Sequence, residues 1–139
     1  PTPAARARAA VRAAAAERER QPQPPDIDKR TRRRLARGTE RVEARLDLHG
    51  LFQEEAHRRL RVFLASAQAE GRGLVLVITG KGRAANDLGD RGVLRRAVPE
   101  WLRQPALRRY VSEFGPANQT HGGEGAFYVR LRRRARDRS

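Results

Sequence analysis

Leu74-Val75-Leu76-Val77-Ile78 is the stretch from which the fold of this chain can be predicted. The run is apolar throughout and rich in β-branched side chains, which is typical of a central strand covered by helices on both sides or at one end. The chain leaves it through Thr79-Gly80-Lys81-Gly82-Arg83, where glycines and cations replace the apolar residues. The sequence therefore predicts a buried strand that ends in a basic, glycine-rich turn.

Amphipathic segments lie on either side of this strand. Upstream, apolar and polar residues alternate over residues 41–49, which predicts a strand with one buried face. Its expected inward residues are Val42, Ala44, Leu46 and Leu48. A helical spacing of apolar residues then predicts a helix of about 18 residues after Gly50, with Gly71 as its C-terminal stop.

Downstream of the central strand, the pattern predicts one more helix and two more strands. The helix covers residues 93–102 and contains Pro99, which kinks it or restarts it as a new turn. Residues 110–114 form a short strand that Gly115-Pro116 is expected to break. Residues 126–131 alternate as a final strand.

In this order, the elements predict an α/β two-layer sandwich, β-α-β-α-β-β, with a mixed four-stranded sheet. Right-handed crossovers place the C-terminal ends of the first two strands on one rim. A basic, largely disordered N-terminal arm precedes the sandwich, with a helical tendency from Val11 to Arg20. The chain then divides into an Ala/Arg/Pro-rich arm (1–25), a basic bridging helix (26–40), the domain (41–131) and a basic tail (132–139).

The composition favours a nucleic-acid partner. With 31 Lys and Arg against 16 Asp and Glu, the net charge is +15 and the pI about 11.7, so the chain attracts polyanions. A GC-rich coding bias is the alternative source of an Arg- and Ala-rich composition. Because there are no cysteines, a disulfide framework, a thiolate metal site and a cysteine nucleophile are excluded. No long uncharged run predicts a membrane span, and a cytoplasmic location is expected.

Asp47 and His49 are the candidate catalytic residues. Side chains two residues apart in a strand share a face, so the two are expected to point the same way at the strand end. His49 then serves as a general base, and Asp47 orients the imidazole or holds a divalent metal such as Mg²⁺. The structural alternative is that both side chains cap the following helix.

The turn after the central strand is the candidate substrate-binding loop. Gly80 and Gly82 let backbone N–H groups approach an anion, and Lys81 and Arg83 add positive charge. The nucleotide-binding pattern G-x-x-x-x-G-K-[ST] is absent. A glycine-rich connection without a ligand is the alternative.

Two further polar residues precede the last strand. His121 and Glu124 are candidates for a second imidazole or carboxylate, although glycines before a strand more often serve turn geometry. His57 is expected at the surface or the edge of the core. Three histidines without metal-ligand spacing argue against a zinc site.

Three short motifs occur in order: Leu46-Asp47-Leu48-His49-Gly50, Thr79-Gly80-Lys81-Gly82 and Gly122-Gly123-Glu124-Gly125-Ala126-Phe127-Tyr128-Val129. Together they resemble the Smr (small MutS-related) domain, over roughly residues 45 to 131, and the upstream basic segment resembles the extension of stand-alone bacterial members. The resemblance implies a β-α-β-α-β-β sandwich similar to the C-terminal domain of a bacterial translation initiation factor.

The resemblance also implies an endonuclease that nicks DNA or cuts RNA. Activity then falls on Asp47 and His49, and Gly80, Lys81 and Gly82 line the substrate site. Arg83 is counted with this loop for its positive charge, not from the resemblance. Thr79, which stands where relatives have Thr or His, is counted among the substrate-binding residues of the same loop. The competing function is a non-catalytic module that uses the same basic rim to bind nucleic acid or a ribosomal surface.

Overall fold

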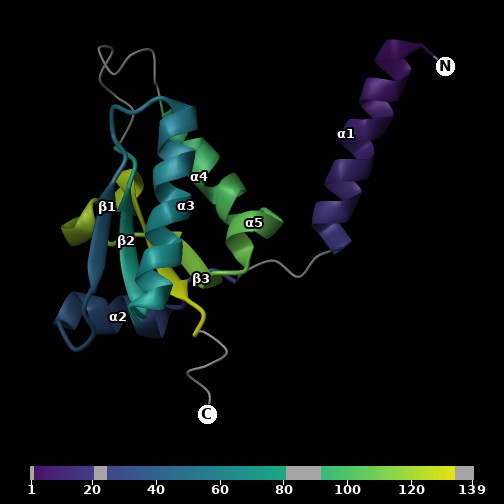
Figure 1. Cartoon of the computed structure of the whole chain (residues 1–139). Helices are drawn as coiled ribbons and strands as arrows, with labels where there is room; N and C mark the ends of the chain where they lie inside the picture. The colour runs from purple at the N-terminus through teal and green to yellow at the C-terminus, as the bar shows by residue number, and fades with distance from the viewer. Residues whose placement is uncertain (1, 21–24, 81–91, 134–139) are drawn as a thin grey trace.

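The protein is described here by a computed structural model that covers residues 2–20, 25–80 and 92–133. One sheet forms its centre, with helices packed against it (Figure 1). The elements, in chain order, are α1 (Pro3–Arg20), α2 (Lys29–Arg37), β1 (Ala44–Asp47), α3 (Gln53–Ala69), β2 (Leu74–Ile78), α4 (Val93–Arg103), α5 (Pro105–Arg108), β3 (Val111–Pro116), η1 (Gln119–His121), η2 (Gly123–Gly125) and β4 (Ala126–Leu131).

The sheet is mixed and four-stranded, with the order β1-β2-β4-β3. β1 and β2 are parallel, whereas β4 is antiparallel to both of its neighbours. Asp47 is in register with Ile78, so the C-terminal ends of β1 and β2 meet at one rim. The predicted α/β class, mixed sheet and shared rim are all confirmed.

Helices cover both faces of β2, as its apolar sequence predicts. On one face, Val75 and Val77 pack with residues of α3, α4 and α5, including Leu64. On the other face, α2 adds a second, smaller core in which Leu35 packs with Leu76. The predicted stop of α3 is also confirmed, because Gly71 takes the left-handed conformation just beyond the helix end.

Residues 25–27 cover the open edge of β3. The Ile27 N–H donates to the Phe114 carbonyl at 3.2 Å, and the Phe114 N–H donates to the Pro25 carbonyl at 3.1 Å. Ile27 is buried beneath this contact. An exposed edge strand invites pairing with other chains, so the segment closes a surface that would otherwise promote aggregation.

Two sequence predictions about strands were wrong. Gly115-Pro116 does not break β3, which pairs with β4 as far as Pro116. A proline is tolerated there because β3 is an outer strand of the four-stranded sheet. Val42 does not share a core with Leu46: it packs with the smaller core, because β1 begins only at Ala44 and the alternation does not extend upstream of it.

The arm predicted to be largely disordered is helical over residues 3–20. The helix begins at Pro3 rather than Val11, because the Thr2 hydroxyl accepts the Ala5 N–H at 3.0 Å and proline suits the first helical position. Val11 is exposed, and Figure 1 shows α1 apart from the sheet. Local helix propensity therefore decides this segment, not packing. None of the helices in the described parts of the chain combines the length and hydrophobicity that a membrane crossing requires.

An ion-pair network ties the segment after α2 to the sheet. Glu40 accepts from Arg130 at 2.5 Å and from Arg34 at 3.1 Å, and Arg130 also donates to Glu113 at 3.1 Å. Partial burial by itself raises the pKa of Glu40, but the hydrogen bonds and charges of Arg130 and Arg34 outweigh it and lower the pKa overall.

Glu40 is therefore expected to stabilise the fold in a pH-dependent way. A carboxyl whose pKa is lower in the folded state contributes fully above its ordinary pKa, here 4.5, and loses that contribution as the pH falls through the folded value. We expect the difference in unfolding free energy between the wild type and Glu40→Gln, measured with urea, to be constant near neutrality and to shrink below pH 4.5. Two curves that stay parallel down to strongly acidic pH would contradict this.

Candidate active site

The end of β1 presents Asp47 and His49 at the rim. Asp47 is the last residue of the strand, and the next residue, Leu48, is fully buried and donates its N–H to the Ile78 carbonyl at 2.7 Å. The ladder to β2 thus continues to Leu48, after which Gly50, with a φ of 78°, turns the chain toward α3. The buried leucine anchors the two polar residues on either side of it.

Asp47 and His49 are in direct contact, as the sequence predicts. The Asp47 Oδ1 lies 2.6 Å from the His49 Nδ1 and also accepts the His49 backbone N–H at 3.0 Å. The two side chains are 50% and 62% exposed. An ionised carboxylate can only accept hydrogen bonds, so we assign the proton to Nδ1, which makes Nε2 the basic nitrogen of the neutral ring.

The second and third motifs converge on this pair. The N–H groups of Thr79 and Gly80 both donate to the Gly125 carbonyl, at 2.8 and 3.0 Å. Gly80 has a φ of 82°, and a Cβ placed on it would lie 3.3 Å from the His49 Cβ. Three segments distant in the sequence thus meet at one rim, with Gly80 directly beside the imidazole-bearing residue.

The structure locates part of the predicted substrate-binding loop. Thr79 is buried, and its hydroxyl donates to the Gly80 carbonyl at 3.1 Å, so its side chain holds the turn together. Lys81, Gly82 and Arg83 lie outside the described residues. Their contact with a substrate stays a prediction.

His121 and Glu124 take other partners. His121 Nδ1 lies 2.5 Å from the hydroxyl of the buried Tyr128, and the two rings meet edge to face. Glu124 forms an ion pair with Arg95 in α4 at 3.3 Å. Their described contacts thus join the third motif to the sheet and to α4. The sequence pattern did not indicate that Arg95, in the first turn of α4, would pair with Glu124.

A resident metal would find a sparse set of ligands among these residues. Among the described residues, Asp47 is the carboxylate beside His49, and its Oδ1 already contacts the His49 ring. Divalent cations such as Mg²⁺ prefer six oxygen ligands, part of which can be water. No group of three or more His, Asp or Glu side chains able to hold a metal occurs within the described ranges. Asp47 would be a ligand if an ion binds.

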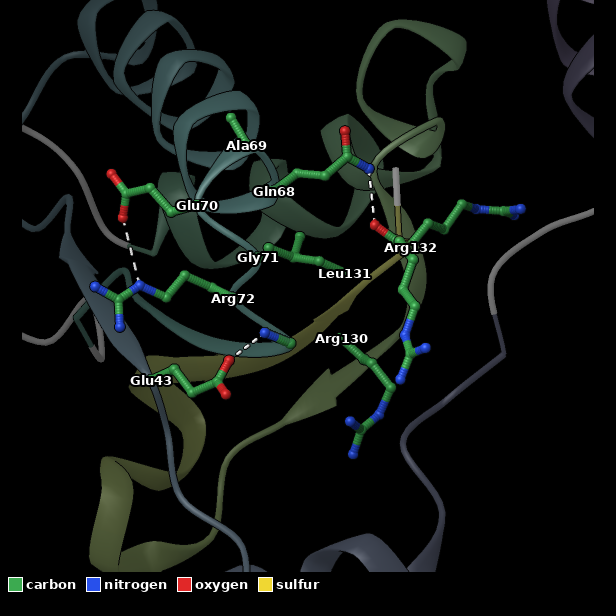
Figure 2. A pocket seen from close by; sticks show the side chains of 11 residues that line it. Glu43, Gln68, Ala69, Glu70, Gly71, Arg72, Arg130, Leu131 and Arg132 are labelled. Atoms are coloured by element: carbon green, nitrogen blue, oxygen red, sulfur yellow. Dashed lines mark hydrogen bonds and ion pairs between the residues drawn. The ribbon is translucent and has the colours of Figure 1, made fainter. Parts of the chain in front are cut away.

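A charged hollow lies at the opposite end of the sheet (Figure 2). It has a volume of about 730 Å³ and is lined by the end of α3 and by β4. Several of its charged groups bind within the protein: Glu43 accepts the backbone N–H groups of Gly73 and Leu74, and Arg72 pairs with Glu70. We interpret this hollow as a structural junction that holds the start of β2.

Gly80 provides a test of how closely the rim is packed. We expect Gly80→Ala to lower the free energy of unfolding by about 1–2 kcal/mol, the cost of a left-handed alanine, and to displace His49 from its contact with Asp47. Gly71→Ala is the matched control, because Gly71 has a φ of 78° and an added Cβ there meets no atom within 4 Å. Gly80→Ala should be destabilised at least as much as Gly71→Ala in urea, and only Gly80→Ala should shift the NMR signals of the His49 ring. Unchanged His49 signals in both folded variants would show that this contact does not position the ring.

Comparisons with known proteins match more than half of the chain to one family. The Smr domain family model matches residues 46–132. Two relatives, each described as ribosome rescue factor SmrB, come from Aeromonas hydrophila and Escherichia coli O7:K1. They are 31% and 30% identical over 106 and 105 residues, which is 76% of this chain in both cases. The chain spans about half the length of these relatives, 55% and 51%.

Two solved structures share the fold. The Smr domain of Thermus thermophilus MutS2 is 32% identical with a TM-score of 0.54, and the match covers 64% of this chain and 98% of that domain. YdaL, a stand-alone small MutS-related protein from Escherichia coli, is 31% identical with a TM-score of 0.60, and the match covers 82% of this chain and 86% of YdaL.

Proposed function

Because this chain belongs to the Smr domain family, we propose that it is an endonuclease that cleaves RNA through Asp47 and His49. The observation that carries the proposal is the contact of 2.6 Å between the Asp47 Oδ1 and the His49 Nδ1. It matches the arrangement of a general base oriented by a carboxylate, on a partly exposed rim that a polymer can reach.

The geometry suits transesterification at an RNA phosphate. His49 Nε2 takes the proton of a ribose 2′-hydroxyl, and the 2′-oxygen attacks the adjacent phosphorus. The bond to the 5′-oxygen breaks, leaving a 2′,3′-cyclic phosphate on one product and a 5′-hydroxyl on the other. The imidazolium returns its proton to the departing 5′-oxygen. Asp47 stabilises the imidazolium, and Lys81 is the cation we propose for the charge that develops on the phosphate.

The names of the relatives support RNA on the ribosome as the proposed substrate. Two of them are described as ribosome rescue factors, and the net charge of +15 suits a surface rich in phosphate. Nicking of DNA is the second candidate chemistry. It requires an activated water, which Asp47 would supply with Mg²⁺ or another divalent cation.

A cleavage assay tests the proposal. Purified protein is incubated with a labelled RNA and with a branched DNA, each in EDTA and in Mg²⁺, beside the Asp47→Ala/His49→Ala double variant. We expect RNA cleavage in EDTA with a cyclic-phosphate product, and its loss in the double variant. Cleavage of DNA only in Mg²⁺ would favour the water mechanism. Binding without any cleavage, or cleavage unchanged in the double variant, would overturn the proposed site.

A further inference from the structure

We propose that α2 carries a phosphate-binding surface that holds nucleic acid and leads it to the rim. This surface, the α2 basic face, consists of Lys29, Arg30, Arg33 and Arg37. This inference rests on the proposed function in one respect, namely that the ligand is a nucleic acid. The residues of the α2 basic face lie outside the range matched by the family model, 46–132, and outside the rim.

The helix geometry gathers these four cations on one side. At 3.6 residues per turn, they fall within an arc of about 100°. Thr31 and Leu35, the buried residues of α2, lie on the opposite side, where Leu35 packs in the smaller core. All four cations are exposed. The sheet therefore holds the α2 basic face toward solvent.

The ion pairs of α2 are formed by cations outside the α2 basic face. Arg32 pairs with Asp26 at 3.2 Å, and Arg34 pairs with Glu40 at 3.1 Å. Asp28, the acidic residue at the start of the helix, caps it by accepting the Thr31 N–H. In the described parts of the chain, no carboxylate forms an ion pair with the four cations of the face. The charge of Asp28 acts on Arg30, and the rest of their combined field is available to an external anion.

The strand that follows α2 connects this face to the candidate site. Arg45 is in register with Leu76, and Asp47 with Ile78, two residues that pack in or against the smaller core beneath α2. Paired residues of a sheet point to the same side, so Arg45 and Asp47 project on the side that α2 covers. Figure 1 shows β1 running from the end of α2 to the rim. The exposed Arg45 lies about 7 Å before Asp47 along the strand.

The chemistry of the face fits a nucleic-acid backbone better than a protein. Protein interfaces usually have an apolar or aromatic centre with few charges. On α2 the exposed apolar side chain is Ala36, which has little area to bury. Three guanidinium groups and one ammonium suit phosphate, which arginine binds bidentately. An acidic protein is the alternative partner, and it predicts that RNA affinity does not depend on the α2 basic face.

The test measures binding in a chain that does not cleave. We would introduce Arg30→Gln, Arg33→Gln and Arg37→Gln together into a His49→Gln background, and measure the affinity for a labelled single-stranded RNA by fluorescence anisotropy at several salt concentrations. Losing three phosphate contacts should reduce the slope of log affinity against log salt by about 2. Near 0.1 M salt, the affinity should fall about tenfold or more.

The matched control removes the same charge from the opposite face of the sheet. Arg58→Gln, Arg59→Gln and Arg61→Gln change exposed residues of α3, and they should leave the salt slope nearly unchanged. Equal losses of RNA affinity in both triple variants would show only a diffuse electrostatic attraction and would contradict the proposal. An unchanged salt slope in the α2 variant, or no RNA binding by the parent chain, would also overturn it. If only the α2 variant loses RNA affinity and the wild type does not cleave RNA, the proposed endonuclease activity is wrong, but the proposed role of the α2 basic face still holds.

Discussion

Replacing His49 by glutamine is expected to lower RNA cleavage by about 10²–10⁴-fold, the usual contribution of a positioned general base. Glutamine retains polarity and similar length but cannot take up the 2′-hydroxyl proton. Asp47→Asn is expected to lower the same rate, because a neutral amide cannot stabilise the imidazolium or hold Nδ1–H as firmly as the carboxylate does. Both losses should appear in the rate constant of the cleavage step, measured in single-turnover assays with saturating enzyme. The affinity for RNA should not change.

His57→Gln is the matched control for the loss of a histidine. His57 lies on α3, where its ring meets Trp101 edge to face with centroids 4.9 Å apart, at the edge of the core as its sequence position predicts. Burial lowers the pKa of His57, with the charge of Arg61 acting in the same direction, so a neutral amide is tolerated there. Cleavage should remain near the wild-type rate. If His57→Gln and His49→Gln lost equal activity, the rim would not be the site.

Leu48→Ala is expected to have the largest effect on stability at the site, a loss of about 2–5 kcal/mol. Leu48 is fully buried in the main core and stands between the two catalytic candidates. Alanine leaves a cavity under the end of β1, where the Leu48 N–H holds the strand to Ile78. The loss should be measured by urea unfolding, and cleavage per folded molecule should fall as well.

Leu46→Ala provides the comparison for that measurement. Leu46 belongs to the same strand and packs against the same core, but it is only half-buried. Its truncation should cost less free energy and should leave the Asp47 and His49 contact in place. If both variants lost the same free energy and the same activity, burial of Leu48 would not be what positions the pair.

Periodicity in the sequence was sufficient for the elements built from regular patterns. The apolar run at Leu74–Ile78 predicts a strand buried on both faces, and the spacing of Asp47 and His49 predicts their shared direction. Both follow from local geometry, since side-chain direction repeats every two residues in a strand. The convergence of Gly80 on the pair follows from the crossover rule for parallel strands.

Contacts between irregular segments could not be predicted in this way. Residues 25–27 pair with β3 through backbone groups, which carry no side-chain signal. Arg130 reaches Glu40 across the sheet, and His121 meets the hydroxyl of Tyr128, but neither pair has a spacing that marks it. The helical tendency of the arm was predicted from Val11 to Arg20, whereas the helix begins at Pro3, where the Thr2 hydroxyl accepts the Ala5 N–H.

Residues 25–27 close the edge of β3, but they lie outside the range that the family model matches, residues 46–132. A fragment cut at the family boundary, residue 46, would lose Ile27 and Leu35 and leave Leu76 and the aromatic ring of Tyr128 open to water. Such a fragment would carry both an unpaired strand and an apolar sheet face, the combination that drives chains to associate. In this protein, residues 25–27 and α2 therefore complete the sheet that presents the rim, and they precede the range that the family model matches.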